Sequence, residues 1–107
     1  MKSLDIAALQ KAVRKRRIEW RKHALQRLAE RSIAQKDVLE VLQSGERIED
    51  YPDDTLYPSA LFFGRVGSKP LHVVVAFDEI NQIAYIVTAY EPSFEVFEND
   101  YKTRRTP

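Results

Sequence analysis

The residues best suited to chemistry lie in one basic stretch, Trp20 to Arg31, which the spacing of its apolar residues predicts to be an amphipathic helix. His23, Arg27 and Arg31 recur at intervals of four, so at about 100° per residue they share one ~80° sector. Histidine titrates near neutral pH and arginine matches phosphate geometry, so this face could cleave RNA without a metal. The alternative is a solvated face, on which His23 caps or packs locally and the arginines pair with Glu30 or with the acidic helix that follows.

Three further candidates lie in the second half of the chain. His72 is the one polar residue in the apolar run Leu71–Phe77. It could pair with His23 as acid and base if both face one cleft, or be a buried structural histidine. Glu91 could act as a base or orient His23, or form an ion pair with the basic helix. Tyr90 could stack on a nucleobase or donate a proton, or close the core at the sheet edge.

The formal net charge of +1 conceals two oppositely charged regions. Residues 11–31 carry nine cations and two anions, whereas residues 36–54 carry seven anions and two cations. The cations that could grip an RNA backbone are Arg14, Lys15, Arg16, Arg17, Arg21 and Lys22, with Arg104 and Arg105 near the C-terminus. The alternatives are a solvated helix face and a disordered basic tail. The two charged regions could also pair between copies in a homodimer.

The pattern predicts helices first and strands afterwards. Ser3 is a suitable N-cap for a first helix over residues 3–16. Two more helices are predicted over about 21–31 and 35–44, with Gly45 as the C′ residue of the second. Residues 18–20 alternate apolar, polar, apolar, as in a short extended link or the lead-in to the next helix. Strands are predicted over 47–51, 60–66, 71–77 and 82–90, followed by a short turn or helix over 92–101. The expected fold is α+β, with N-terminal helices and a mostly antiparallel four-stranded sheet whose strand 71–77 is covered on both faces.

Composition excludes several classes of function. With no cysteine and three glycines, the chain has no thiol nucleophile and no usual phosphate-binding loop. No residues have metal-ligand spacing, so neither a metal nor a cofactor is expected; the acidic stretch 49–54 is better explained as a surface loop. No apolar run approaches ~20 residues, and the N-terminus is unlike a signal peptide. We expect a single cytoplasmic domain over residues 1–107 with no membrane partner.

Several short motifs occur in a characteristic order and spacing. They are His23-Ala24-Leu25-Gln26-Arg27, Glu30-Arg31-Ser32-Ile33, Asp37-Val38, Gly45 to Asp54, Pro70 to Val74, and Thr88 to Pro92. In these motifs the chain resembles the bacterial domain-of-unknown-function family numbered 4258 over residues 20–92. The helix over 3–16 and the basic tail over 102–107 lie outside the resemblance. Ser32 stands where the family pattern usually has glycine, and Ala34 where it often has a capping serine or threonine.

The resemblance implies a RelE-like fold and a relation to the RelE and BrnT type toxins, small α+β ribonucleases often encoded beside an antitoxin. The expected activity is metal-independent cleavage of RNA, free or ribosome-bound, with an antitoxin protein as partner. His23 would be the general acid or base, and Arg27 and Arg31 would hold the scissile phosphate. His72 and Glu91 would be supporting proton-transfer groups. The alternative is a non-catalytic module of the same fold that binds nucleic acid or an acidic protein.

Overall fold

A computed structural model describes residues 3–54 and 56–106 of the chain. Its first helix, α1 (Ile6–Arg14), begins at Asp5, whose carboxylate accepts a hydrogen bond from the Ala8 amide nitrogen at 3.1 Å. The prediction of Ser3 as the N-cap is therefore wrong. Both residue types cap helices well, and the pattern alone did not separate them. The helix is shorter than expected at both ends.

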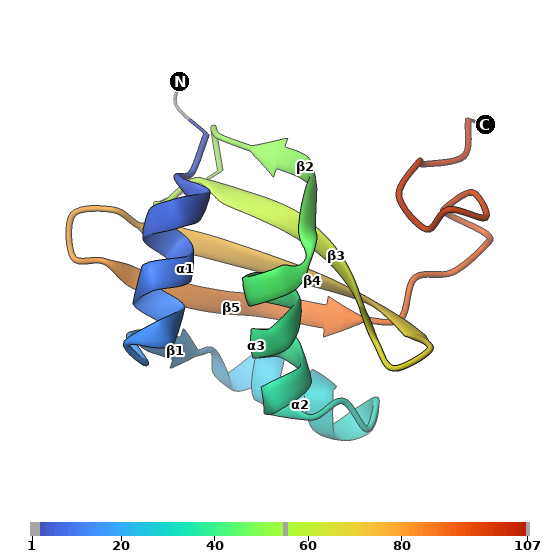
Figure 1. Ribbon diagram of the computed structural model, residues 1–107, viewed down its shortest axis with the longest axis horizontal. Helices are drawn as coiled ribbons and strands as arrows, with labels where there is room; N and C mark the ends of the chain where they lie inside the picture. The colour runs from blue at the N-terminus through green and yellow to red at the C-terminus, as the bar shows by residue number, and fades with distance from the viewer. Residues whose placement is uncertain (1–2, 55, 107) are drawn as a thin grey trace.

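Two more helices, α2 (Lys22–Glu30) and α3 (Gln35–Ser44), follow close to their predicted positions. With α1 they cover one face of the sheet (Figure 1). Their buried apolar residues include Leu28 of α2 and Leu42 of α3. This two-layer arrangement confirms the α+β class. Within the described residues, no helix is long and apolar enough to cross a membrane.

The sheet has five strands in the order β1-β5-β4-β3-β2. Their bounds are β1 (Ile18–Trp20), β2 (Glu46–Tyr51), β3 (Ser59–Val66), β4 (Lys69–Asp78) and β5 (Ile83–Tyr90). Strands β2 to β5 are antiparallel neighbours, as expected. The prediction of four strands is wrong, because β1 adds a fifth that runs parallel to β5, with Glu19 opposite Tyr85. Three residues carry too little alternation to distinguish a strand from a link.

Alternation along β4 divides the protein into two sides. Leu71, Val73, Val75 and Phe77 point into the core beneath the helices, where each large apolar side chain contributes about 1.5–3 kcal/mol. His72 therefore points to the opposite face of the sheet, which carries no helix. It is nevertheless fully buried. Strand β4 is thus covered on both faces around His72, as its apolar composition predicts.

The cover on that second face is the C-terminal segment, residues 91–106, the red coil beyond the end of β5 in Figure 1. The segment folds on itself, since the Glu98 amide donates to the Thr103 carbonyl at 2.7 Å and the Arg105 amide to the Val96 carbonyl at 2.8 Å. Phe97 is buried against the sheet. The expectation of a disordered basic tail is therefore wrong, and the segment forms turns and an isolated bridge rather than a helix.

Helix α3 ends at Gly45, as predicted, but for a different reason. The backbone there is extended, with φ −81° and ψ −178°, so Gly45 is not a left-handed C′ residue. A Cβ at this position would lie 2.5 Å from the carbonyl oxygens of Val41 and Phe63. Close approach of the helix end to β3 therefore requires glycine here.

Candidate functional site

The predicted catalytic face of α2 is only partly free. His23 is exposed and makes no hydrogen bond or ion pair with any described residue. Arg27 is also exposed, and its Nη1 lies 3.2 Å from Glu30 Oε1, the pairing weighed as the alternative for this face. His23 and Arg27 remain one helical turn apart on the same side of α2.

Arg31, the third member of that set, has a structural role. Its Nη1 donates to the Ala89 carbonyl oxygen at 2.8 Å and to Thr88 Oγ1 at 3.3 Å. Strand β1 pairs with β5 only as far as Ile86, so the edge of β5 is open beyond that point. Arg31 thus supplies a hydrogen-bond donor to a carbonyl oxygen on this strand edge that has no partner strand.

His72 is at the centre of a second group, on the helix-free face of the sheet. Its Nε2 lies 2.6 Å from the Tyr101 carbonyl oxygen, and because a carbonyl only accepts, Nε2 carries the proton. The ring packs edge-on against Phe97, with centroids 4.5 Å apart, and lies 5.4 Å from the ring of Tyr90. Its Nδ1 is buried and has no partner among the described atoms. Burial lowers the pKa of His72, although the bond to Tyr101 and the charge of Glu49 oppose that shift.

A charged pair lies beside His72. Arg104 Nε and Nη2 donate to the two carboxylate oxygens of Glu49 at 2.6 and 3.0 Å, and the Tyr51 hydroxyl donates to the same carboxylate. Burial raises the pKa of Glu49, but the hydrogen bonds from Arg104 and Tyr51 outweigh it and leave the pKa below its usual value. Burial also raises the pKa of Tyr51 and of Tyr90. At neutral pH the group thus holds one carboxylate, one guanidinium, two neutral phenols and a neutral imidazole.

We call these residues the His72 cluster: Glu49, Tyr51, His72, Tyr90 and Arg104. The structure brings together three of the predicted site residues, His72, Tyr90 and Arg104. Sequence reasoning missed the other two, although alternation along the predicted strand 47–51 places Glu49 and Tyr51 on one face.

The remaining predicted residues of the second half lie elsewhere. Glu91 pairs with Lys69 at 3.7 Å, not with the basic helix. Arg105 pairs with Glu98 at 2.9 Å and also donates to the Phe94 carbonyl oxygen. Within the described ranges, no group of three or more His, Cys, Asp or Glu side chains is arranged to hold a metal ion.

Most cations between Lys11 and Lys36 belong to no ion pair of the described residues. We define the basic surface as Lys11, Arg14, Lys15, Arg16, Arg17, Arg21, Lys22 and Lys36. None of these eight makes an ion pair with a described residue. They come from the C-terminal end of α1, the flanks of β1, and the first turns of α2 and α3, along the lower side of the molecule in Figure 1.

Two members of the basic surface have neutral partners. The Arg17 guanidinium donates to the Asn81 and Gln82 carbonyl oxygens at 2.7 and 3.1 Å. Arg21 lies over the ring of Tyr85, 5.6 Å from its centroid. None of these partners carries a negative charge.

Most cations that follow α3 in the chain are paired, in contrast. The ion pairs there involve Arg47, Lys69, Lys102, Arg104 and Arg105. The unpaired cations are therefore concentrated in residues 11–36 of the chain, which can attract a polyanion.

Comparison with known proteins identifies the family. Residues 20–91 match the model described as "Domain of unknown function (DUF4258)", and α1 and the chain after residue 91 fall outside the match. No curated protein and no solved structure matches the chain. Because the match covers well over half of its length, the chain belongs to the DUF4258 family.

Proposed function

We propose that this domain binds RNA through the basic surface. One observation carries the proposal: the eight cations of the basic surface, between Lys11 and Lys36 in the chain, have no ion-pair partner among the described residues, while most other cations are paired. Cations that make no ion pair favour binding of a phosphate backbone, because their contacts with phosphates release the counterions condensed on the nucleic acid.

The choice of RNA follows from a proposed relation to the RelE and BrnT type toxins. The mixed α+β architecture, with helices near the N-terminus and four antiparallel strands after them, supports that relation, although the parallel strand β1 departs from the expected RelE-like sheet. An antitoxin that covers the basic surface is the protein partner this relation suggests, and the cytoplasm is the corresponding location.

A titration with a fluorescently labelled 12-nucleotide RNA tests the proposal. Fluorescence anisotropy at 50 mM salt should give a Kd of about 10⁻⁵ M or tighter, and binding should weaken as salt rises. Lys22→Gln should weaken binding. Lys69→Gln removes the same charge from an exposed lysine outside the basic surface and should leave the Kd unchanged. Equal effects of the two substitutions would argue against a localised surface.

A second candidate is metal-independent cleavage of RNA, which the composition of the His72 cluster favours. Glu49 or His72 could accept the proton of the ribose 2′-hydroxyl, Arg104 could stabilise charge on the phosphate, and a tyrosine could protonate the leaving oxygen. Since Phe97 and Tyr101 cover His72, cleavage that uses His72 requires residues 97–101 to move aside while Arg104 keeps its pair with Glu49. On α2, the exposed residues His23 and Arg27 are the other candidate pair, and Arg27 is paired with Glu30.

Expression in bacteria separates these possibilities. Growth and total RNA integrity are followed for the wild type, His23→Ala and Glu49→Gln, after each variant is shown to be folded. If the wild type arrests growth and cleaves RNA, and only Glu49→Gln abolishes both effects, catalysis belongs to the His72 cluster. If only His23→Ala abolishes both effects, catalysis belongs to α2. Healthy growth with intact RNA in all three would support a binding module.

A further inference from the structure

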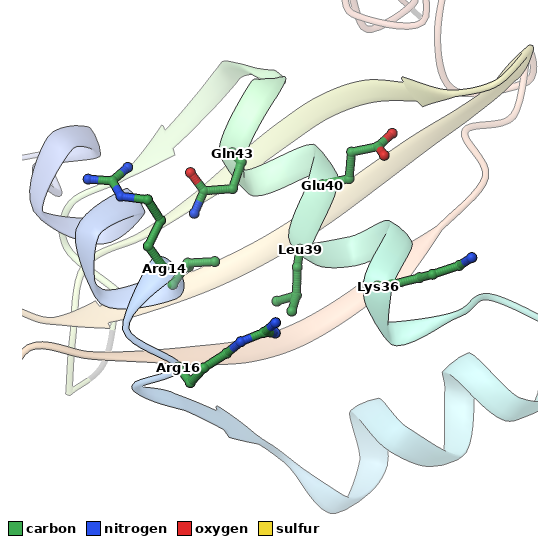
Figure 2. Close-up of a pocket in the computed structure, with 7 residues that line it drawn as sticks. Arg14, Arg16, Lys36, Leu39, Glu40 and Gln43 are labelled. Carbon is green, nitrogen blue, oxygen red and sulfur yellow. The ribbon is translucent and has the colours of Figure 1, made fainter.

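Part of the basic surface is hollowed into a groove between α1 and α3. The groove measures about 570 Å³ and is lined by Val13, Arg14, Arg16, Lys36, Leu39, Glu40 and Gln43 (Figure 2). Val13 and Leu39 are its apolar members. Gln43 is already engaged, because its side-chain amide donates to the Gln10 carbonyl oxygen at 3.0 Å. The groups available to a ligand are therefore mainly the charged ones.

Cations outnumber anions in this groove. Arg14, Arg16 and Lys36 make no ion pair within the described chain, and Glu40 is the single carboxylate. Figure 2 shows the Arg16 guanidinium reaching toward Leu39, while Arg14 and Lys36 extend outward on different sides. Because these three charged groups are spread apart rather than aimed at one point, they suit an extended polyanion better than a single phosphate ion.

Arg16 is held in an unfavourable backbone conformation. Its φ is 62°, in the left-handed region that favours glycine. The turn is a Schellman motif, in which the Arg16 amide donates to the Val13 carbonyl at 3.1 Å and the Arg17 amide to the Ala12 carbonyl at 2.9 Å. Four other described non-glycine residues, Ser32 among them, also have a positive φ, so the turn fixes the position of Arg16 without by itself marking a functional side chain. Here the strain places a guanidinium in the groove where glycine would fold better.

We propose that the α1–α3 groove holds the sugar–phosphate backbone of the bound RNA. In this arrangement Arg14, Arg16 and Lys36 contact successive phosphates, and the apolar patch of Val13 and Leu39 lies against a ribose. The inference rests on the proposed RNA binding and identifies where on the basic surface the strand lies.

The test uses two glycine substitutions at equivalent helix ends. Ser32 follows α2 with φ 55°, in the same kind of turn as Arg16, but lies outside the groove. Arg16→Gly and Ser32→Gly should each raise the Tm by about 4 °C, because each relieves the same strain. Arg16→Gly should also raise the Kd for the labelled 12-nucleotide RNA about fivefold to tenfold, and Ser32→Gly should leave it unchanged. Arg16→Lys, which keeps the charge, should bind more tightly than Arg16→Gly.

Each other outcome overturns a defined part of the proposal. If Arg16→Gly is stabilised but binds RNA like the wild type, while Lys22→Gln binds weakly, the groove is not the site and the proposed function survives. If the wild type does not bind the RNA at all, both proposals fail. If poly-L-glutamate binds and the RNA does not, the groove serves an acidic protein segment instead.

Discussion

The end of α2 allows a sharp prediction of stability. Ser32 has φ 55°, its amide donates to the Ala29 carbonyl at 3.3 Å, and the Ile33 amide donates to the Leu28 carbonyl at 2.9 Å. These contacts define a Schellman turn, whose left-handed residue is usually glycine. The Ser32 side chain is exposed and makes no hydrogen bond with the described residues. Replacing serine with glycine therefore removes strain and no contact.

The magnitude follows from two opposing contributions. A side chain in the left-handed region costs roughly 1–2 kcal/mol. Glycine gains about 0.4–1 kcal/mol of extra entropy in the unfolded chain, which offsets part of that relief. Ser32→Gly should thus increase the free energy of unfolding by about 1 kcal/mol. At roughly 2.1 cal/mol/K per residue, this chain has an unfolding entropy near 0.2 kcal/mol/K, so the Tm should rise by about 4 °C.

Thermal unfolding followed by circular dichroism measures this shift. Ser32→Ala is the matched control, because it removes the hydroxyl but keeps the Cβ, and its Tm should stay within about 1 °C of the wild type. A Tm for Ser32→Gly equal to or below that of the wild type would refute the reasoning. It would mean that the backbone at the α2–α3 corner is not left-handed.

Three further predictions concern the helix-free face and the end of α3. Because burial lowers the pKa of neutral His72 in the folded state, the unfolded chain binds the proton first as pH falls below about 6.5. The free energy of unfolding should therefore decrease between pH 6.5 and the lowered native pKa, and in urea titrations His72→Phe should flatten that dependence. Arg104→Ala removes a bidentate ion pair with Glu49, so it should lower the free energy of unfolding by about 1 kcal/mol in the same titrations. It should also speed diethylpyrocarbonate modification of His72 relative to the exposed His23, and equal rates in Arg104→Ala and the wild type would contradict the covering role of the C-terminal segment. Gly45→Ala places a Cβ against two backbone oxygens and should lower the free energy of unfolding by about 2 kcal/mol or more, and a stability change near zero would show that the helix end can move.

Long, strongly patterned elements could be predicted from the sequence. The three helices and the four antiparallel strands lie close to their expected positions, because each has enough residues to show its period. The coverage of β4 on both faces also followed from its apolar run. Strand β1 could not be recognised, since its three residues are ordered by a partner strand at the other end of the chain.

Candidate site residues could be predicted as a group only where they lie within one helix or strand. The spacing of His23 and Arg27 on α2 is a local property, and both are exposed as expected. The pairing of Arg104 with Glu49 joins residues 55 positions apart, and no local pattern encodes it. The same limit explains why the tail was interpreted as disordered, because its order depends on Phe97 packing against His72.

The most direct measurement is the salt dependence of RNA binding by the wild-type protein. The Kd for the labelled 12-nucleotide RNA is determined by anisotropy at several salt concentrations from 50 to 300 mM. If about four cations of the basic surface contact phosphates, a plot of log affinity against log salt should have a slope near −3. No binding at 50 mM salt, or a slope near zero, would contradict recognition of RNA by these unpaired cations.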